Sequence, residues 1–267
     1  MLDNVIEINN LSLPYAFQNF SISFERNKLI VVTGANNCGK TTLIRSIVGQ
    51  IFTDNTIYIF SQELEYYRIT ELNTILKYII SQEYTFTKES VFAELLYSLN
   101  NLDIEYSIKE KKIKQILQDF NLLKFQNTNP TSLTDTLKVK LQLAKHLLQT
   151  PKILLLDDIF LNMSKEEATN IISVLKKFQE KMDLTIIITT SNLEMALQSD
   201  YIYVIDNNTI ALEGPPLGVL QKDNILNRLG LELPFIVDLS VKLRDYDLIS
   251  DISMNIDIEG MVSLLWK

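Results

Sequence analysis

Cysteine and glycine are scarce in this sequence. One cysteine among 267 residues excludes an internal disulfide and fits a reducing compartment. Only 7 residues are glycine, whereas Asn, Ile, Lys and Leu are abundant. No low-complexity tract or internal repeat occurs. The length allows one large α/β domain with an appendage.

Long apolar runs and positive charge are lacking as well. No apolar run approaches about 18–20 residues, so no membrane-spanning helix is expected. The first residues show no basic segment followed by an apolar core, so no signal peptide is expected either. The formal net charge of −8 disfavours a non-specific nucleic-acid surface, and we expect no nucleic-acid partner.

The clearest motif is the segment G-A-N-N-C-G-K-T-T at residues 34–42, which fits the phosphate-binding pattern G-x-x-x-x-G-K-[ST]. An apolar run at 29–32 precedes it and predicts a buried parallel strand. Residues 42–48 have helical spacing and end at Gly49. Strand, glycine loop and helix are the context that a P-loop requires, and a chance match in a Gly-Lys turn is the alternative.

Each P-loop residue type has a chemical reason. Backbone N–H groups of the loop and of the helix N-terminus would point at phosphates. Lys40 would reach the outer phosphates and the Thr41 hydroxyl would bind Mg²⁺. Asn37 stands at a position where Asn tolerates positive φ, and Cys38 is predicted to be inert. The candidate phosphate-binding residues are Gly34, Asn36, Asn37, Cys38, Gly39, Lys40, Thr41 and Thr42.

The rest of the chain alternates strands and helices. Further strands are predicted at 4–9, 20–25, 55–60, 152–158 and 184–190, with a hairpin at 201–213 whose turn is Asn207-Asn208. Helices are predicted over most of 71–121, at 135–148, from Ser164 to about Phe178, at 192–198 and in the tail 217–267. The patterns from Ser107 to Glu110 and from Ser164 to Glu167 predict capping boxes.

This order predicts an α/β P-loop NTPase fold with a helical subdomain at about 63–130, a core over 1–215 and a C-terminal helical extension over 216–267. The apolar strand at 152–158 ends in Asp157 and Asp158. Asp157 is placed to hold Mg²⁺ through water while phosphate oxygens fill other positions.

The order of these motifs resembles the ATP-binding cassette (ABC) family over the whole chain, which implies an ABC-type nucleotide-binding domain that uses ATP and Mg²⁺. The segments 228–244 and 259–267 resemble the C-terminal extension of ATPase subunits of energy-coupling factor (ECF) transporters. The apolar residues of the tail allow two compatible interpretations, a helical cover on the sheet or a dimerisation surface between ATPase subunits.

The resemblance implies roles for further residues. Tyr15 falls at the aromatic that stacks on adenine, although a core or surface Tyr is the alternative. Ser61 aligns with the glutamine of the Gln loop, so Gln62 is the candidate if the register slips by one residue. The signature Leu-Ser-Gly-Gly-Gln is replaced by L-T-D-T-L at 133–137, where both glycines are missing. Asp135 would repel a phosphate by about 4 kcal/mol at ~4 Å and a dielectric constant of ~20.

Two catalytic positions also depart from the family pattern. Asp158 replaces the catalytic Glu with a side chain shorter by roughly 1.5 Å, and a misplacement of ~1 Å costs about a hundredfold in rate. Ser191 replaces the switch His that contacts the γ-phosphate. The only histidine, His146, is predicted to be an ordinary helix residue.

The resemblance therefore implies a subunit that binds Mg-ATP well, hydrolyses it slowly and pairs with a different ATPase subunit. The implied partners are an ECF-type transmembrane subunit and a substrate-binding membrane subunit, at the cytoplasmic face of the membrane. A soluble ATP-dependent regulatory switch of the same family is the first alternative, and a small-molecule kinase is the second. Membrane association or a phosphorylated product would distinguish them.

Overall fold

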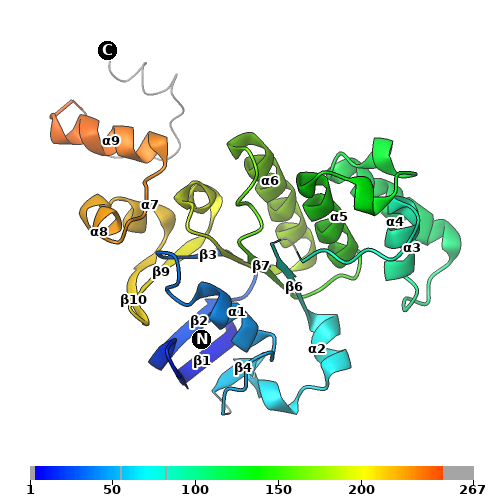
Figure 1. Cartoon of the computed structure of the whole chain (residues 1–267), viewed down its shortest axis with the longest axis horizontal. Helices are drawn as coiled ribbons and strands as arrows, with labels where there is room; N and C mark the ends of the chain where they lie inside the picture. Colours follow the sequence, from blue (N-terminus) through cyan, green and yellow to red (C-terminus); the bar gives the residue numbers. More distant parts are fainter. Residues whose placement is uncertain (1–3, 55, 82, 249–267) are drawn as a thin grey trace.

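The computed structural model describes residues 4–54, 56–81 and 83–248. Its main sheet has six strands in the order β10-β9-β3-β8-β7-β6 (Figure 1). These strands are β3 (Leu29–Thr33), β6 (Leu76–Ile80), β7 (Ile153–Asp157), β8 (Thr185–Thr189), β9 (Tyr201–Asp206) and β10 (Thr209–Gly214). Every pairing is parallel except that of β9 with β10. The carboxyl ends of the parallel strands therefore meet at one edge of the sheet.

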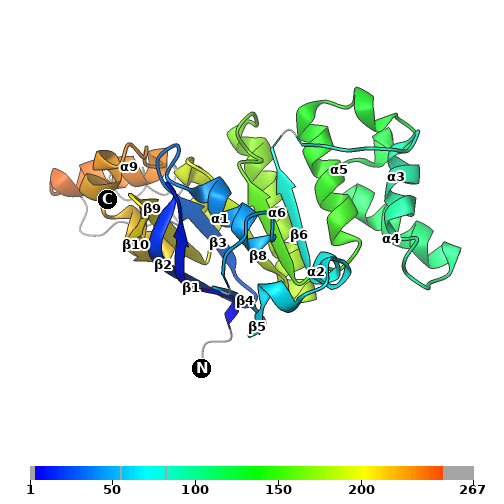
Figure 2. The ribbon, with the colours of Figure 1, turned by 60° about the horizontal axis from the view of Figure 1, so that its bottom comes forward.

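A second sheet is antiparallel and has the order β2-β1-β4-β5 (Figure 2). It contains β1 (Asn4–Leu13), β2 (Phe17–Glu25), β4 (Ile57–Ile59) and β5 (Gln62–Glu63). The strands predicted at 4–9 and 20–25 are confirmed and are longer than predicted, whereas β4 is shorter. Tyr203 of β9 donates a hydrogen bond of 2.6 Å from its hydroxyl to the Ser23 carbonyl of β2, so the two sheets are joined at this point.

Helices lie on both faces and at one end of the main sheet (Figures 1 and 2). They are α1 (Lys40–Ile47), α2 (Ile69–Ile75), α3 (Val91–Ser98), α4 (Tyr106–Asp119), α5 (Asp135–Leu147), α6 (Lys165–Met182), α7 (Pro216–Leu220), α8 (Asp223–Arg228) and α9 (Phe235–Asp245). Short 3₁₀ helices occupy Leu64–Tyr66, Leu123–Phe125, Pro130–Ser132 and Leu193–Gln198. Among the described residues, no helix combines the length and apolarity needed to cross a membrane.

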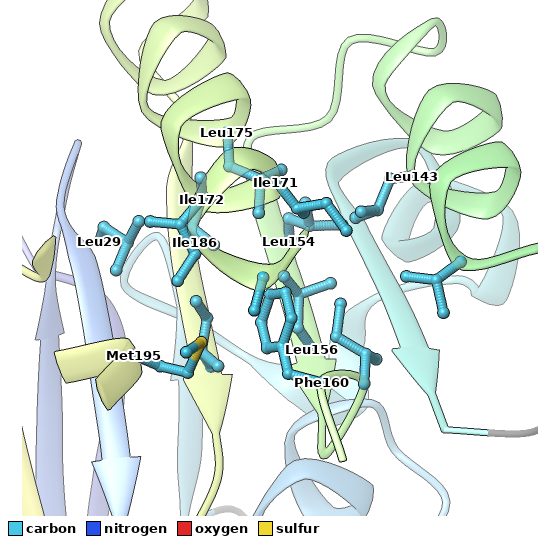
Figure 3. Close-up of a cluster of buried hydrophobic side chains, with 14 of the residues drawn as sticks. Leu29, Leu143, Leu154, Leu156, Phe160, Ile171, Ile172, Leu175, Ile186 and Met195 are labelled. Carbon is cyan, nitrogen blue, oxygen red and sulfur yellow. The ribbon is translucent and has the colours of Figure 1, made fainter. Parts of the chain in front are cut away.

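The central strands β3, β7 and β8 are buried at every residue, and their apolar side chains alternate between two hydrophobic clusters. Leu154 and Leu156 belong to the cluster beneath α5 and α6, whereas Ile153 and Leu155 belong to the cluster that faces α1 and the antiparallel sheet. Figure 3 shows the first cluster, in which Ile171 and Leu175 of α6 point toward β7. All three leucines of β7, together with Ile171 and Leu175 of α6, are at most 1% exposed. This packing fixes the strand ends that carry the polar residues.

The helical region differs from the prediction at β6. The segment predicted as mostly helical, 71–121, contains a strand at Leu76–Ile80 that pairs with β7 in parallel. A short apolar run cannot be assigned to helix or strand by periodicity alone, and here the neighbouring strand decides. Within the region 63–130, where a helical subdomain was expected, α2 precedes β6 and α3 begins after it at Val91.

Capping was predicted correctly for one helix and incorrectly for another. Ser164 accepts the Glu167 N–H at 3.2 Å and the Glu167 carboxylate accepts the Ser164 N–H, which completes the capping box of α6. Helix α4 instead begins at Tyr106 with Glu105 at the N-cap, so Ser107 lies inside the first turn. The predicted ending 259–267 lies outside the described residues.

Candidate functional site

The loop between β3 and α1 is shaped by residues with positive φ. Gly39 has φ 101° and occupies the N-cap of α1, and Asn37 has φ 66°, as predicted for this position. A Cβ added to Gly39 would lie 2.9 Å from Cζ of Phe17, and one added to Gly34 would overlap the carbonyl oxygen of Ile205. The loop therefore needs glycine at both ends to bring its backbone against its neighbours.

The Lys40 side chain is held inside this loop. It is 5% exposed, and its ammonium donates to the carbonyl oxygens of Gly34 at 2.8 Å and Ala35 at 2.9 Å. The same nitrogen lies 3.7 Å from the sulfur of Cys38, the one free cysteine. A buried cation among backbone donors of a helix N-terminus favours an anionic ligand.

Two carboxylates follow β7 at the edge of the sheet next to the loop. Asp157 is 2% exposed and accepts a short hydrogen bond from the Thr189 hydroxyl of β8. Asp158 adopts φ 52°, and its N–H donates to the Thr189 carbonyl at 3.1 Å. Its Oδ1 is buried and accepts no hydrogen bond from the described residues. Burial, and next the charge of Asp157, raise the pKa of the Asp158 carboxyl, while Lys40 opposes this effect.

A cavity of about 530 Å³ lies between the P-loop and Asp158, and Asp157 is not among its lining residues. Its lining residues are Tyr15, Ala16, Asn36, Asn37, Gly39, Lys40, Thr41, Thr42, Asp158 and Asn208. Tyr15 is fully exposed at φ 64° in the turn between β1 and β2, so its ring is available to a ligand. Asn208, in the β9–β10 turn, was not predicted as a site residue, because nothing in the sequence shows that this hairpin reaches the P-loop.

The family model for the ABC transporter matches residues 17–160, which is more than half of the chain. The chain belongs to the ABC transporter ATP-binding family. The energy-coupling factor transporter ATP-binding protein EcfA of Pediococcus pentosaceus is 26% identical over 243 residues, covering 88% of this chain and 87% of that protein. EcfA1 of Lactobacillus delbrueckii subsp. bulgaricus is 23% identical over 278 residues, covering 100% of this chain and 98% of that protein.

A solved structure supports the same fold. The structure of cbiO1 from Clostridium perfringens, described as part of the ABC transporter complex cbiONQ, superposes with a TM-score of 0.75 at 20% identity. The match covers 89% of this chain and 98% of that chain. The α/β ABC-type P-loop fold predicted from the sequence is therefore confirmed.

ABC ATPases bind ATP, typically with Mg²⁺, and the residues of this pocket fit such a ligand. Gly34 and Gly39 let the loop backbone pack closely against Ile205 and Phe17, and Lys40 supplies a buried cation. Asp158 and Thr41 line the same cavity, and the buried Oδ1 of Asp158 has no hydrogen-bond partner among the described residues. Oxygen ligands of these kinds are the ones that Mg²⁺ prefers.

The structure does not bring Gln62 to the pocket. Gln62 is exposed in β5, where it pairs with Ile59 of the antiparallel sheet, and it is absent from the cavity lining. The reason is the strand order. The edge strand that pairs with β7 is β6 and not β5, so the residue next to the end of β7 is Ser81, whose N–H donates to the Asp157 carbonyl at 3.0 Å. A second Ser-Gln pair follows β6, and its glutamine, Gln82, falls outside the described residues.

Ser191 follows β8 but does not line the cavity either. The preceding Thr190 N–H donates to the Val32 carbonyl at 3.1 Å, and the Thr190 hydroxyl accepts the Asn192 N–H at 3.0 Å. These bonds hold the backbone on both sides of Ser191. Its role at the switch position stays a prediction.

The segment at the ABC signature position begins α5. Thr134 occupies the N-cap, although its hydroxyl makes no capping hydrogen bond. The Asp135 side chain is 68% exposed and lies 3.5 Å from the Lys138 ammonium. A surface hollow of about 580 Å³ is lined by Asp135 and Lys138 together with Tyr84, Thr85, Phe86 and Thr131. The exposed carboxylate at the helix N-terminus partly neutralises the charge that would otherwise attract an anion.

Proposed function

We propose that this chain is the ATP-binding subunit of an ECF-type ABC importer, which closes with a second ATPase subunit to drive uptake of a micronutrient. The observation that carries this proposal is the similarity to ECF ATP-binding proteins over the whole chain, such as the 100% coverage with the L. delbrueckii protein. That coverage extends past residue 215 into the region of α7, α8 and α9, beyond the part that the ABC family model matches.

In this proposal the pocket holds Mg-ATP at two places. Lys40 and the loop backbone would bind the outer phosphates. Thr41, which lines the cavity, would hold the metal together with Asp157, which is buried just behind the lining residue Asp158. Tyr15 stacks on the adenine ring, which its full exposure permits. The bound Mg²⁺ supplies charge neutralisation for the departing phosphate, while this chain supplies orientation.

We propose that ATP hydrolysis at this chain's own site is slow. Asp158 has to orient and deprotonate a water, but its side chain is one methylene shorter than the Glu of the family. Burial and the charge of Asp157 raise the pKa of this carboxyl. Ser191 carries no charge and lies outside the cavity lining, so it adds little to transition-state stabilisation.

We propose that the start of α5, which would face the partner's nucleotide, binds the partner's γ-phosphate weakly. Asp135 places a negative charge at the position where the family presents glycine N–H groups to the partner's γ-phosphate. The Lys138 ion pair is exposed and screened, so it offsets only part of that repulsion. A pair of two identical chains would have two such sites, which favours pairing with a different ATPase subunit.

The proposed location is the cytoplasmic face of the membrane, where an ECF-type transmembrane subunit and a substrate-binding subunit complete the transporter. In cell fractionation this chain should sediment with membranes and be released by mild detergent. Recovery in the soluble fraction alone would favour the regulatory switch.

An ATPase assay tests the proposed division of labour. The lone chain should bind ATP but turn over slowly, and the pair with its partner subunit should turn over faster. Lys40→Ala should abolish binding in the lone chain. Full turnover by the lone chain that is lost in Lys40→Ala would refute the weakened site.

A further inference from the structure

Asn208 lines the nucleotide pocket although no nucleotide-binding motif discussed above includes it. Asn208 lies in the two-residue turn between β9 and β10, where Asn207 has φ 44° and Asn208 has φ 66°. Positive φ at both positions is the pattern of a type I′ turn, which favours glycine at its second position. Asparagine tolerates this conformation and, unlike glycine, carries a carboxamide on a residue that lines the pocket.

The strand order places Asn208 away from the metal end of the pocket. The carboxylates follow β7, which is separated from β9 by β3 and β8 (Figure 1). With neighbouring strands about 4.8 Å apart, the end of β9 lies roughly 14 Å from the end of β7. Lys40 and the P-loop, which begin after β3, lie between them. Asn208 therefore faces the part of the ligand opposite the Mg²⁺-bound phosphates.

Tyr15 lies on the same side. It precedes β2, and β2 is bound to β9 by the hydrogen bond from Tyr203 to Ser23 and by the contact of the Phe24 and Tyr203 rings, whose centroids are 5.7 Å apart. The turn before β2 and the turn after β9 both line the one cavity. An exposed aromatic ring and a carboxamide thus share the end of the pocket that is far from Asp157.

We propose that the Asn208 carboxamide hydrogen-bonds the nucleoside part of the nucleotide and is a binding residue that selects nucleotides over bare polyphosphate. A carboxamide offers one acceptor and two donors, so it can pair with ribose hydroxyls or with the edge of a base. This inference rests on the proposed ATP site, and it adds recognition of the nucleoside that phosphate-binding groups do not provide.

The test is calorimetric titration of the full chain with Mg-ATP and, separately, with magnesium tripolyphosphate. Asn208→Gly should weaken ATP binding about three- to tenfold, the loss of one neutral hydrogen bond, and leave tripolyphosphate binding unchanged. Glycine suits this turn position, so the hairpin should keep its fold. The matched control is Asn207→Gly, because Asn207 is exposed, bonds the Asp206 carboxylate at 2.9 Å and does not line the cavity.

Unchanged ATP affinity in Asn208→Gly would overturn the inference, and so would an equal loss for ATP and tripolyphosphate. Lys40→Ala should lose both ligands, which shows that the pocket is the nucleotide site whatever Asn208 does. If the unaltered chain binds neither ligand, the proposed function itself fails.

Discussion

The Glu94 carboxylate of α3 joins three separate parts of the chain. It is fully buried and accepts hydrogen bonds from the Thr87 N–H at 2.9 Å, the Lys88 N–H at 3.0 Å and the Lys145 ammonium at 2.6 Å. It therefore ties the segment after β6 to α3 and α5. Replacing Glu94 by Ala leaves two backbone donors and a largely buried cation without their acceptor.

Glu94→Ala should lower the free energy of unfolding strongly, because it removes one partner of the buried Glu94–Lys145 pair and leaves the other in place. Removing one partner of such a pair costs about 3–5 kcal/mol of unfolding free energy. Glu94→Gln keeps one acceptor oxygen but loses the charge, so its cost should be smaller, about 1–3 kcal/mol. Glu110→Ala is the matched control, since the Glu110–Lys114 pair is exposed and is expected to contribute less than about 1 kcal/mol.

The contribution of Glu94 to stability changes with pH in one direction. Burial alone would raise the pKa of Glu94, but the bonds from Lys145, Thr87 and Lys88 together lower it below its ordinary 4.5. The stability that this group contributes is therefore complete above pH 4.5 and is lost as the pH falls through the lowered pKa. The difference between the unaltered chain and Glu94→Gln should shrink over that acidic range.

Urea unfolding monitored by circular dichroism measures these differences at neutral and acidic pH. A cost for Glu94→Ala within about 1 kcal/mol of the Glu110→Ala control would refute the reasoning. So would a difference between the unaltered chain and Glu94→Gln that grows as the pH falls below 4.5.

Three further predictions concern the pocket. Gly39→Ala should weaken ATP binding at least about tenfold in calorimetry, because φ 101° and the Phe17 ring both oppose a Cβ; unchanged affinity would contradict this. Tyr15→Ala should lower ATP affinity by roughly 0.5–1.5 kcal/mol, whereas Tyr15→Phe should preserve it, since only the ring stacks; equal losses would argue against stacking. In a pair whose partner site has been inactivated, Asp158→Glu should raise turnover at this chain's own site by roughly ten- to a hundredfold, and turnover with Asp158 should be lost as the pH falls through its raised pKa, while Asp158→Asn leaves that site inactive at every pH; a slower Asp158→Glu site would refute the side-chain-length argument.

The sequence predicted the P-loop and the strands around it because local signals agree there. The P-loop motif predicts a strand before the glycine turn and a helix after it, and the residue patterns on both sides agree with this. The structure has the strand at Leu29–Thr33 and the helix at Lys40–Ile47. The positive φ of Asn37 was indicated by its place in the P-loop together with its residue type. Asp157 and Asp158 could likewise be placed at the sheet edge, since they end a fully apolar strand.

The Gln62 prediction and the helical assignment of β6 went wrong because strand order is a non-local property. The run at Leu76–Ile80 becomes a strand only through its pairing with β7, and that pairing carries Ser81, rather than Gln62, to the Asp157 backbone. Asn208 was missed for the same reason. Its turn was predicted, but its position in the pocket depends on β9 pairing with β3.

The most direct test of the proposed function is to tag this chain, solubilise membranes of the cells that produce it in mild detergent, and identify the proteins that copurify. The account predicts a second, distinct ABC ATPase together with a multi-span membrane protein, in a stable complex that survives gel filtration. Recovery of the chain alone from the soluble fraction, with no ATPase partner in the membrane extract, would contradict it.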